Sequence, residues 1–387
     1  MKVLFITDGI TPFVIGGMQK HSHGLVKNLI SQGIQVTLVH CVFEGQRLPS
    51  LEEVKQSLDV HSDAKLEIFT FRFPKGNGFP GHYIKSSYSY STQVYEKFKN
   101  TLSDFDFIYT KGFTGWYFIE KKKKGASSPP IAVKFHGYEM FQPGGSFSMR
   151  LKKMLLKGPA LWISTNADYV FSYGSKITEL IKSIGVNSSK IVEVPTAIDD
   201  AWIIDSKPIQ EGPVKILFIG RYERRKGIEE LNEVILELQE SSGFIFEFVG
   251  PIPQSKRLKR SDVLYHGEQR ERQDILRIID GCQVLICPSH SEGMPNVILE
   301  AMARGLCVLA SDVGATNLMV RNNESGFLFP PANQEGILNV LNSVMKMSKN
   351  QIHQMGEEGR ILVKSRFSWL KVSELTINEM RKRLGIH

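Results

Sequence analysis

Residues 287–305 read Cys287-Pro-Ser-His-Ser-Glu-Gly-Met-Pro-Asn-Val-Ile-Leu-Glu-Ala-Met-Ala-Arg-Gly305. The segment continues a short apolar run, Val284–Cys287, which is typical of a buried strand. The polar residues that follow predict a loop, Pro295 suits the first turn of a helix, and Gly305 suits the end of that helix. The backbone N–H groups at such a helix start can hold an anion or sugar hydroxyls. The segment therefore predicts a strand–loop–helix unit with a ligand site at the loop.

The same unit, a short apolar run followed by a helical pattern, recurs along the whole chain. The first half contains the runs Val3–Thr7, Gln35–Cys41, Leu66–Phe73, Phe107–Thr110, Ile131–Phe135, Tyr169–Ser172 and Ile191–Val194. The second half contains Val214–Ile219, Phe244–Val249, Val263–Tyr265, Val284–Cys287 and Cys307–Ala310. Strands buried on both faces have such continuous apolar runs, and their alternation with helices indicates parallel sheets covered on both sides. Two series of runs indicate two doubly wound α/β domains.

The boundary between the two predicted domains lies where proline, glycine and aspartate gather. We expect a first domain over residues 1–195, a linker over 196–213 and a second domain over 214–366. The last stretch, Ser368–Leu384, has an amphipathic helical pattern with no apolar run after it.

Composition limits the class of protein. The chain has 387 residues, of which 42% are hydrophobic and 23% charged, as in globular proteins. No apolar run reaches the roughly 18 residues that span a bilayer, and Asp8 interrupts the N-terminal run too early for a signal peptide. The four cysteines form no CxxC pair, which predicts buried reduced thiols and a cytoplasmic protein.

The net charge of +8 is placed unevenly. Residues 1–195 contain 24 Lys and Arg against 15 Asp and Glu, whereas residues 196–387 contain 24 against 25. A basic half can meet an anionic membrane or an acidic substrate, and without a recognisable binding motif we expect no nucleic-acid partner. The segment Met149–Lys157 has the pattern of a basic amphipathic helix that lies on an anionic membrane. The alternative is that its apolar face packs on its own domain.

Two carboxylates frame the opening segment. Glu292 lies on the predicted loop and Glu300 on the predicted helix. One carboxylate could meet a hexose while the other meets a ribose of the same extended donor. Considered alone, the pair is better explained as two surface glutamates that flank a helix start.

The residues around this pair resemble a known family. Pro288-Ser289, Glu292-Gly293, Pro295-Asn296 and Glu300-Ala301-Met302-Ala303 match, at the right spacing, the PSxxEGxPNVxLEAMAxG frame of the retaining GT-B glycosyltransferases of family 4, group 1. Upstream, residues 220–227 match the GRxxxxKG motif, and Gly16-Gly17 stand where the family has its glycine loop. The resemblance covers essentially the whole chain. It implies two Rossmann-like domains that face each other across a cleft, with a C-terminal helix (367–387) that returns to the first domain.

The resemblance also implies a nucleotide-sugar donor site, mostly in the second domain. In the family the first Glu of the pair contacts the transferred sugar and the second binds the ribose hydroxyls, which gives these roles to Glu292 and Glu300. Arg221 and Lys226 would neutralise the leaving nucleoside diphosphate, Arg as a planar fork and Lys as a point charge. The other donor-binding residues implied are Gly16, Gly17, Gly267, Gly293, Met294, Pro295 and Asn296.

His136 ends the apolar run Ile131–Phe135. Family members often carry a functional His at this point, near the anomeric carbon, so the catalytic residues that we expect are His136, Glu292, Arg221 and Lys226. The alternative for His136 is a strand-end residue that caps a backbone group. We expect His21 and His23, on the first helix, to be surface or packing residues.

Asp104-Phe105-Asp106 has the form of the DxD metal motif of the other glycosyltransferase fold. Nothing nearby completes a phosphate site, and we interpret the motif as a solvated strand edge. Because Arg221 and Lys226 would carry out the task of a divalent cation, we expect neither a metal nor a cofactor.

The expected function is the metal-independent, retaining transfer of a hexose-type sugar from a nucleotide-sugar to a glycan or lipid-linked acceptor, in cell-surface polysaccharide or glycolipid synthesis. The donor would bind mostly to the second domain and the acceptor to the first. Peripheral attachment to the inner face of the membrane is a further hypothesis. Two alternatives are a nucleotide-sugar epimerase of the same fold and an inactive sugar-nucleotide-binding protein, and the frame around Glu292 and Glu300 weighs against both.

Overall fold

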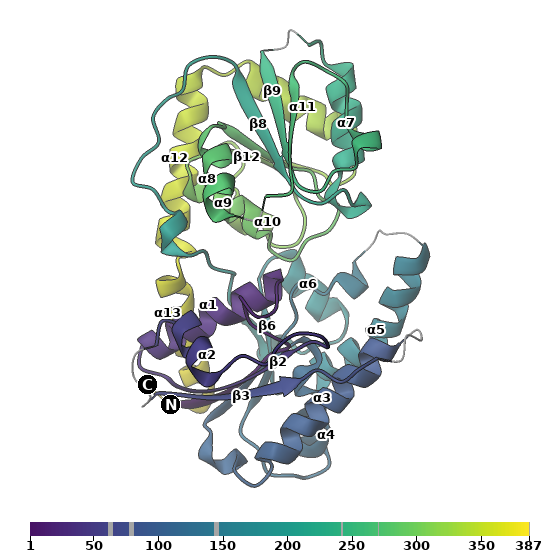
Figure 1. Cartoon of the computed structure of the whole chain (residues 1–387), viewed down its shortest axis with the longest axis vertical. Helices are drawn as coiled ribbons and strands as arrows, with labels where there is room; N and C mark the ends of the chain where they lie inside the picture. Colours follow the sequence, from purple (N-terminus) through teal and green to yellow (C-terminus); the bar gives the residue numbers. More distant parts are fainter. Residues whose placement is uncertain (61–64, 77–80, 143–146, 241–242, 270, 387) are drawn as a thin grey trace. The chain divides into compact units, whose positions relative to one another are not determined.

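The computed structural model describes residues 1–60, 65–76, 81–142, 147–240, 243–269 and 271–386, without the side chains of 147–150. The chain divides into two compact units (Figure 1). Unit 1 combines Met1–Phe141, Phe147–Thr196 and Trp369–His387, and unit 2 consists mainly of Ala197–Ser368. The C-terminal segment therefore belongs to unit 1, although residues Ala197–Ser368 of unit 2 lie between this segment and the rest of unit 1 in the sequence.

Unit 1 is built on a parallel sheet of seven strands in the order β3-β2-β1-β4-β5-β6-β7. The strands are β1 (Lys2–Ile6), β2 (Gln35–Val42), β3 (Leu66–Arg72), β4 (Phe107–Lys111), β5 (Ile131–Lys134), β6 (Tyr169–Ser172) and β7 (Ile191–Glu193). The central strands are buried along their whole length, which explains their unbroken apolar sequences. The strand order reverses between β1 and β4, where Val3 pairs with Phe107.

Helices cover the sheet of unit 1: α1 (Gly17–Ser31), α2 (Leu51–Ser57), α3 (His82–Phe98), α4 (Trp116–Lys123), α5 (Phe147–Asn166), α6 (Lys176–Ser183) and α13 (Trp369–Leu384). Figure 1 shows α13, in yellow, beside α1, in purple. A Cβ atom at Gly24 of α1 would overlap the indole of Trp369, so the two helices can approach closely only because this residue is glycine. This contact confirms that the C-terminal helix returns to the first domain.

Unit 2 repeats the architecture with six parallel strands in the order β10-β9-β8-β11-β12-β13. The strands are β8 (Val214–Ile219), β9 (Phe244–Val249), β10 (Val263–Gly267), β11 (Val284–Cys287), β12 (Cys307–Ser311) and β13 (Gly326–Phe329). The helices are α7 (Ile228–Glu237), α8 (Arg272–Asp280), α9 (Asn296–Ala303), α10 (Thr316–Met319), α11 (Gln334–Met345) and α12 (Lys349–Arg366). Of these strands, β13 was not predicted from the sequence.

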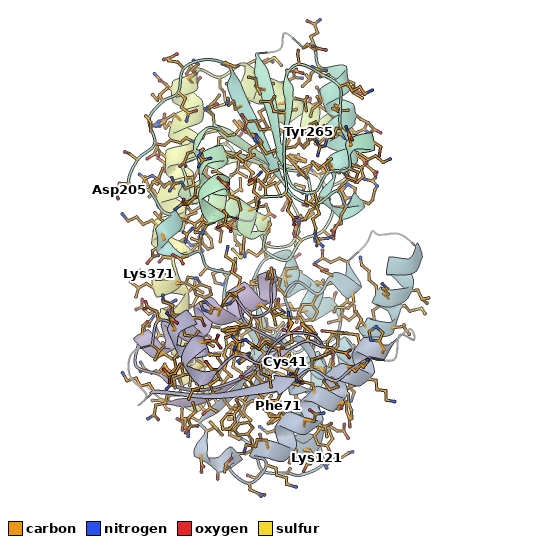
Figure 2. All side chains as sticks on the ribbon, in the orientation of Figure 1. Cys41, Phe71, Lys121, Asp205, Tyr265 and Lys371 are labelled. Atoms are coloured by element: carbon orange, nitrogen blue, oxygen red, sulfur yellow. The ribbon has the colours of Figure 1, made fainter. Side chains whose placement is uncertain are left out.

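The two sheets confirm the predicted fold class of two Rossmann-like, doubly wound domains. Residues 197–213, for which the sequence predicts a linker, pack on unit 2, where Trp202 and Lys207 are buried. All four cysteines are free thiols and buried, as predicted; Figure 2 labels Cys41, which lies on β2. The lysine run that begins at Lys121, also labelled in Figure 2, ends helix α4.

Candidate active site

The motif residues of unit 2 follow the strands at which the sheet order reverses. Arg221 and Lys226 lie on the loop after β8, and Glu292 lies on the loop after β11; these two strands are neighbours in the sheet. In an open parallel sheet, ligands bind at the carboxyl ends of the strands where the order reverses. Sheet topology therefore brings together two motifs that are about seventy residues apart in the sequence.

Two glycines allow the loops of this site to touch. Gly227 has a φ of +66°, and a Cβ atom there would overlap the carbonyl oxygen of Pro288. Gly314 has a φ of +56°, and a Cβ atom there would overlap the carbonyl oxygens of Glu292 and Gly293. A larger residue at Gly227 or Gly314 would both strain the backbone and push the loops apart.

The ion pair between Lys226 and Glu292 lies at the centre of this site. Lys226 Nζ is 2.6 Å from Glu292 Oε1, and the Ser289 hydroxyl donates to the same oxygen at 2.9 Å. Only 17% of the Lys226 side chain and 10% of the Glu292 side chain are exposed. Nη1 of Arg225 lies 3.7 Å from Glu292 Oε2. One carboxylate thus lies between two cations in a partly dehydrated loop.

Arg221 differs from Lys226 in its exposure. Its side chain is 65% exposed and pairs with Glu223 at 3.1 Å rather than with Glu292. Arg224, on the same loop, forms ion pairs with Glu229 and Glu230 of helix α7. An exposed guanidinium held only by a surface ion pair can be redirected to a ligand at little cost.

The donor-binding residues implied beyond the ion pair lie on the same edge of unit 2. Met294 is buried, Pro295 immediately precedes α9, and Asn296 is the first residue of that helix. Glu300 is half-buried on α9. The carbonyl of Gly293 accepts a hydrogen bond of 2.8 Å from the Ala315 amide. Gly267 ends β10 with a φ of +72°.

In unit 1, the glycine loop and His136 lie together at the carboxyl edge of the sheet. A Cβ atom at Gly17 would lie 3.1 Å from His136 Nε2. The other ring nitrogen of His136, Nδ1, is 2.7 Å from the hydroxyl oxygen of Tyr173. Gly16 is the N-cap residue of α1, in an extended conformation. The structure therefore places Gly16, Gly17 and His136 in one site, to which it adds Tyr173.

Buried charges next to this histidine were not predicted from the sequence. Lys111, at the end of β4, and Lys134, at the end of β5, are fully buried. Lys111 Nζ is 3.3 Å from His21 Nδ1, and Lys134 donates to the carbonyl of Val194 at 2.8 Å. Asp8, after β1, is also buried. His21 thus packs in the interior, one of the two roles expected for it. The one signal available was a lysine in or next to each of two apolar runs: Lys111 follows Phe107–Thr110, and Lys134 lies within Ile131–Phe135.

Burial changes the ionisation of these groups. Burial lowers the pKa of Lys111 to about 7 and raises the pKa of Asp8 to about 6. Burial, reinforced by Lys111 and Lys134, lowers the pKa of His136 to about 3. His136 is therefore neutral at neutral pH, and the site in unit 1 presents little net charge to a ligand.

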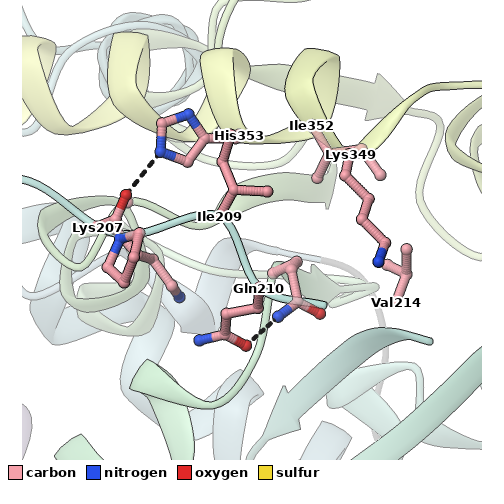
Figure 3. A pocket seen from close by; sticks show the side chains of 10 residues that line it. Lys207, Ile209, Gln210, Val214, Lys349, Ile352 and His353 are labelled. Atoms are coloured by element: carbon pink, nitrogen blue, oxygen red, sulfur yellow. Dashed lines mark hydrogen bonds between the residues drawn. The ribbon is translucent and has the colours of Figure 1, made fainter. Parts of the chain in front are cut away.

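A pocket in unit 2, shown in Figure 3, lies at the opposite edge of its sheet. Val214 and Gln283, which line it, stand at the amino ends of β8 and β11. Its polar groups bond to one another: His353 Nε2 lies 2.7 Å from the carbonyl oxygen of Lys207, and Gln283 donates to Gln210. These contacts attach residues 207–210 to unit 2, and the pocket lies away from the motif residues.

The two aspartates of the DxD motif lie just before β4. Asp104 ends a 3₁₀ turn, and Asp106 accepts a hydrogen bond of 2.7 Å from the backbone N–H of Lys2. Within the described part of the chain, no group of three or more His, Cys, Asp or Glu side chains is arranged to hold a metal ion. Asp106 thus helps to fasten the start of β1 to β4.

Comparison with known proteins identifies the family. Residues 15–202 match the family model described as Glycosyltransferase Family 4, and residues 200–361 match the model described as Glycosyl transferases group 1. Together the two matches cover residues 15–361, which lie in both units and include every motif described above.

Relatives and solved structures agree with these matches. Glycogen synthase of Mycobacterium tuberculosis is 21% identical over 97% of this chain and 93% of its own. The N,N'-diacetylbacillosaminyl-diphospho-undecaprenol alpha-1,3-N-acetylgalactosaminyltransferase of Campylobacter jejuni is 28% identical over 38% of this chain and 40% of its own. Among solved structures, HepE of Anabaena in complex with UDP has a TM-score of 0.72 at 13% identity, covering 99% of this chain and 100% of its own. The chain is a GT-B glycosyltransferase and belongs to family 4, group 1.

Proposed function

We propose that this glycosyltransferase moves a hexose-type sugar from a nucleotide-sugar to a glycan or lipid-linked acceptor, with retention and without a divalent metal. The observation that carries the proposal is the ion pair between Lys226 and Glu292 at the carboxyl edge of unit 2. In a nucleotide-sugar, the transferred sugar and the diphosphate meet at one glycosidic oxygen. A cation and a carboxylate 2.6 Å apart are therefore well placed to contact the diphosphate and the sugar on either side of that oxygen.

The chemistry of the donor assigns the two partners of the pair. A diphosphate oxygen would take over the Lys226 ammonium from Glu292, because a charge-assisted bond to phosphate is strong in a partly dehydrated site. The displaced Glu292 carboxylate could then accept hydrogen bonds from hydroxyls of the sugar. Arg221, whose exposed guanidinium pairs with Glu223, would turn toward the diphosphate as a second cation.

These two cations are the reason for proposing that no metal is needed. As the bond between the sugar and the diphosphate breaks, negative charge grows on the leaving oxygen, and fixed cations nearby stabilise it. Transfer measured with purified enzyme should survive EDTA. Loss of transfer in EDTA, restored by Mn²⁺, would overturn this part of the proposal.

Retention is proposed from the resemblance of the motifs to those of the retaining glycosyltransferases of this family. The bond from the anomeric carbon to the diphosphate oxygen breaks, and the bond to the acceptor oxygen forms on the same face of the sugar. The proton of the acceptor hydroxyl passes to the leaving phosphate oxygen. NMR of the product tests the stereochemistry: the anomeric configuration of the donor should persist, and an inverted product would exclude this course.

The donor and acceptor classes draw on the relatives. HepE is solved with UDP, and the Campylobacter enzyme is named for a sugar linked to diphospho-undecaprenol. We assign the nucleotide-sugar to unit 2 and a glycan or lipid-linked acceptor to unit 1. A panel of nucleotide-sugars screened by thermal shift tests the donor, because a bound ligand raises the apparent melting temperature. No shift with any nucleotide-sugar would contradict the assignment.

A lipid-linked acceptor would place the enzyme at a membrane surface, and unit 1 offers a patch on α5 for that contact. The α5 patch consists of the exposed Leu151, Lys152, Met154 and Lys157; Met154 is 61% exposed. The side chains of Met149 and Arg150, also part of the predicted amphipathic helix, lie outside the described residues. Among the described helices, none has the length and apolar character to cross a bilayer. We propose that the α5 patch rests on anionic lipid.

A further inference from the structure

The contact between Tyr173 and His136 joins two neighbouring strands of unit 1. His136 follows β5 and Tyr173 follows β6, and these strands pair in parallel. The hydroxyl oxygen of Tyr173 lies 2.7 Å from Nδ1 of His136, and the tyrosine is almost completely buried. A hydrogen bond of this length fixes the orientation of the imidazole ring and depends on which nitrogen carries the proton.

The direction of this hydrogen bond follows from the tyrosine. A buried hydroxyl proton needs an acceptor. Within the described residues, His136 is the hydrogen-bonding partner of the Tyr173 hydroxyl. Burial raises the pKa of Tyr173 far above its usual value, so the hydroxyl keeps its proton. Tyr173 therefore donates to Nδ1, and the single proton of a neutral imidazole must reside on Nε2.

Burial keeps the ring of His136 neutral, and two lysines that face it act in the same direction. Lys111 comes from β4 and Lys134 from β5; both act against a second proton on the imidazole. His21 of α1 lies edge-on to the ring, with 6.4 Å between the ring centroids. Lys134 Nζ lies 4.3 Å from the centre of the Tyr173 ring, and Asp8, after β1, interacts with Lys111.

The glycine loop leaves the protonated nitrogen uncovered. Nε2 of His136 faces Gly17, where a Cβ atom would lie 3.1 Å away. Any side chain at this position would crowd Nε2, whereas glycine leaves room for a ligand hydroxyl. Within the described residues, Nε2 of His136 has no hydrogen-bond partner, so its N–H group is available to a ligand.

We propose that Tyr173 is a positioning residue that holds His136 as the Nε2–H tautomer, so that His136 serves as a neutral hydrogen-bond donor to a sugar hydroxyl and not as a base. The second half of this proposal rests on the proposed function and on the place that the family resemblance implies for His136, near the anomeric carbon of the transferred sugar. The first half concerns only the ring and its tyrosine, and it can be tested without any substrate.

The tautomer is measured directly by ¹⁵N NMR of the full-length protein labelled at histidine. The two ring nitrogens of a neutral imidazole have different shifts when protonated and unprotonated, and His136→Gln identifies the signals. We expect a neutral ring with the proton on Nε2 between pH 6 and 8. A charged ring, or a proton on Nδ1, would overturn the proposal without any variant having to fold.

Tyr173→Phe removes the hydroxyl and keeps the ring. The His136 signals should then shift toward a mixture of tautomers. Tyr138→Phe is the matched control, because Tyr138 is also fully buried and its hydroxyl bonds Ser164 at 2.9 Å. The control should leave the His136 tautomer unchanged. Identical tautomers in wild type and Tyr173→Phe would show that Tyr173 does not position the ring.

Kinetics test the donor role. Tyr173→Phe should lower kcat about 3- to 10-fold with little change in the KM for the nucleotide-sugar, as expected for one neutral hydrogen bond. His136→Gln, whose amide N–H can donate, should retain more activity than His136→Ala. A kcat that falls as a group with a pKa near 6.5 gains a proton would identify a base and contradict the proposal. NMR could confirm the Nε2–H tautomer while neither His136 variant alters transfer. In that case the sugar does not bind at His136, but the conclusion that Tyr173 positions the ring is unaffected.

Discussion

The two units arrange their strands alike, but the charged residues at the carboxyl ends of the central strands are buried in unit 1 and partly exposed in unit 2. In both sheets the order reverses between two central strands, and charged residues follow those strands. In unit 1 these are Asp8 and Lys111, and both are buried. In unit 2 they are Arg221, Lys226 and Glu292, which are paired but partly open to solvent.

This difference shows that topology decides where charges gather, whereas burial decides what they can bind. A buried lysine loses much of its charge near neutral pH, as the lowered pKa of Lys111 indicates. A partly exposed lysine with a carboxylate partner can exchange that partner for an anion. Unit 2 is thus suited to a diphosphate, and unit 1 to neutral hydroxyl groups.

The largest effect is expected at the exposed charges. Lys226→Ala should lower kcat/KM about 10²–10³-fold, because it removes a cation from the leaving diphosphate. Steady-state kinetics with the preferred nucleotide-sugar measure it. Lys215→Ala is the control, since Lys215 also pairs with a buried glutamate, Glu247, at 2.9 Å, but near the amino end of β8. Equal losses in both variants would mean that unit 2 responds to a broken ion pair and not to a lost phosphate contact.

The buried charge of unit 1 should appear in the pH dependence of stability. Lys111 has a folded pKa of about 7 against 10.5 when unfolded, so between these values the unfolded state binds more protons and stability rises with pH. From pH 7 to 10, wild type should gain about 3 kcal/mol relative to Lys111→Met.

Denaturant unfolding followed by tryptophan fluorescence measures this gain, because Trp116, Trp162 and Trp369 lie in unit 1. Lys207→Met serves as the comparison in unit 2, where burial lowers the pKa of Lys207 to about 8 and the gain should be smaller. A wild-type protein whose stability follows that of Lys111→Met over this range would show that Lys111 is charged in the folded state.

Substitutions of the two glutamates of unit 2 should affect the binding of the nucleoside diphosphate differently. Glu300→Gln should weaken the free nucleoside diphosphate about tenfold, if it loses charge-assisted bonds to the ribose. Glu292→Gln should not weaken diphosphate binding, and should lower the transfer rate instead. The structure adds a reason: Glu292 competes with the diphosphate for Lys226. Calorimetry with the diphosphate decides between them, and equal weakening by both changes would refute the assigned roles.

The smallest effect concerns the surface charge. Wild type should co-sediment with anionic vesicles at low salt, and Met154→Asp should weaken this binding about fivefold, since one charge near a membrane surface contributes about 1 kcal/mol. Ile361→Asp changes an equally exposed apolar residue, on α12 of unit 2, and should have no effect. Binding to neutral vesicles as strong as to anionic ones, or no binding at all, would dismiss the α5 patch as a lipid contact.

Much of the second unit could be predicted from the sequence, because its motifs are local. The strand, loop and helix of residues 284–305 each carry their own signal: an apolar run, a polar stretch, a proline and a glycine. Gly305 indeed takes a φ of +72° just after α9. The partnership of Lys226 with Glu292 was not predicted, because it depends on β8 and β11 being neighbours.

Less of the first unit could be predicted. The sequence singled out Gly16, Gly17 and His136, but not Tyr173, Lys134 or the depth at which Lys111 lies. Lys111 and His21 are ninety residues apart in the sequence and 3.3 Å apart in space. A lysine at the end of an apolar run is usually solvated, so no local pattern distinguishes a buried one.

By itself, the sequence determined the elements, their alternation, the doubly wound fold and the residues of the motifs, because periodicity and turn chemistry act over a few neighbouring residues. The tertiary structure alone decided which charges are paired, which are buried and which nitrogen of His136 carries its proton. Pairing depends on the order of strands in a sheet, and ionisation depends on how much water the surrounding elements exclude. Both are properties of residues that only the fold brings together.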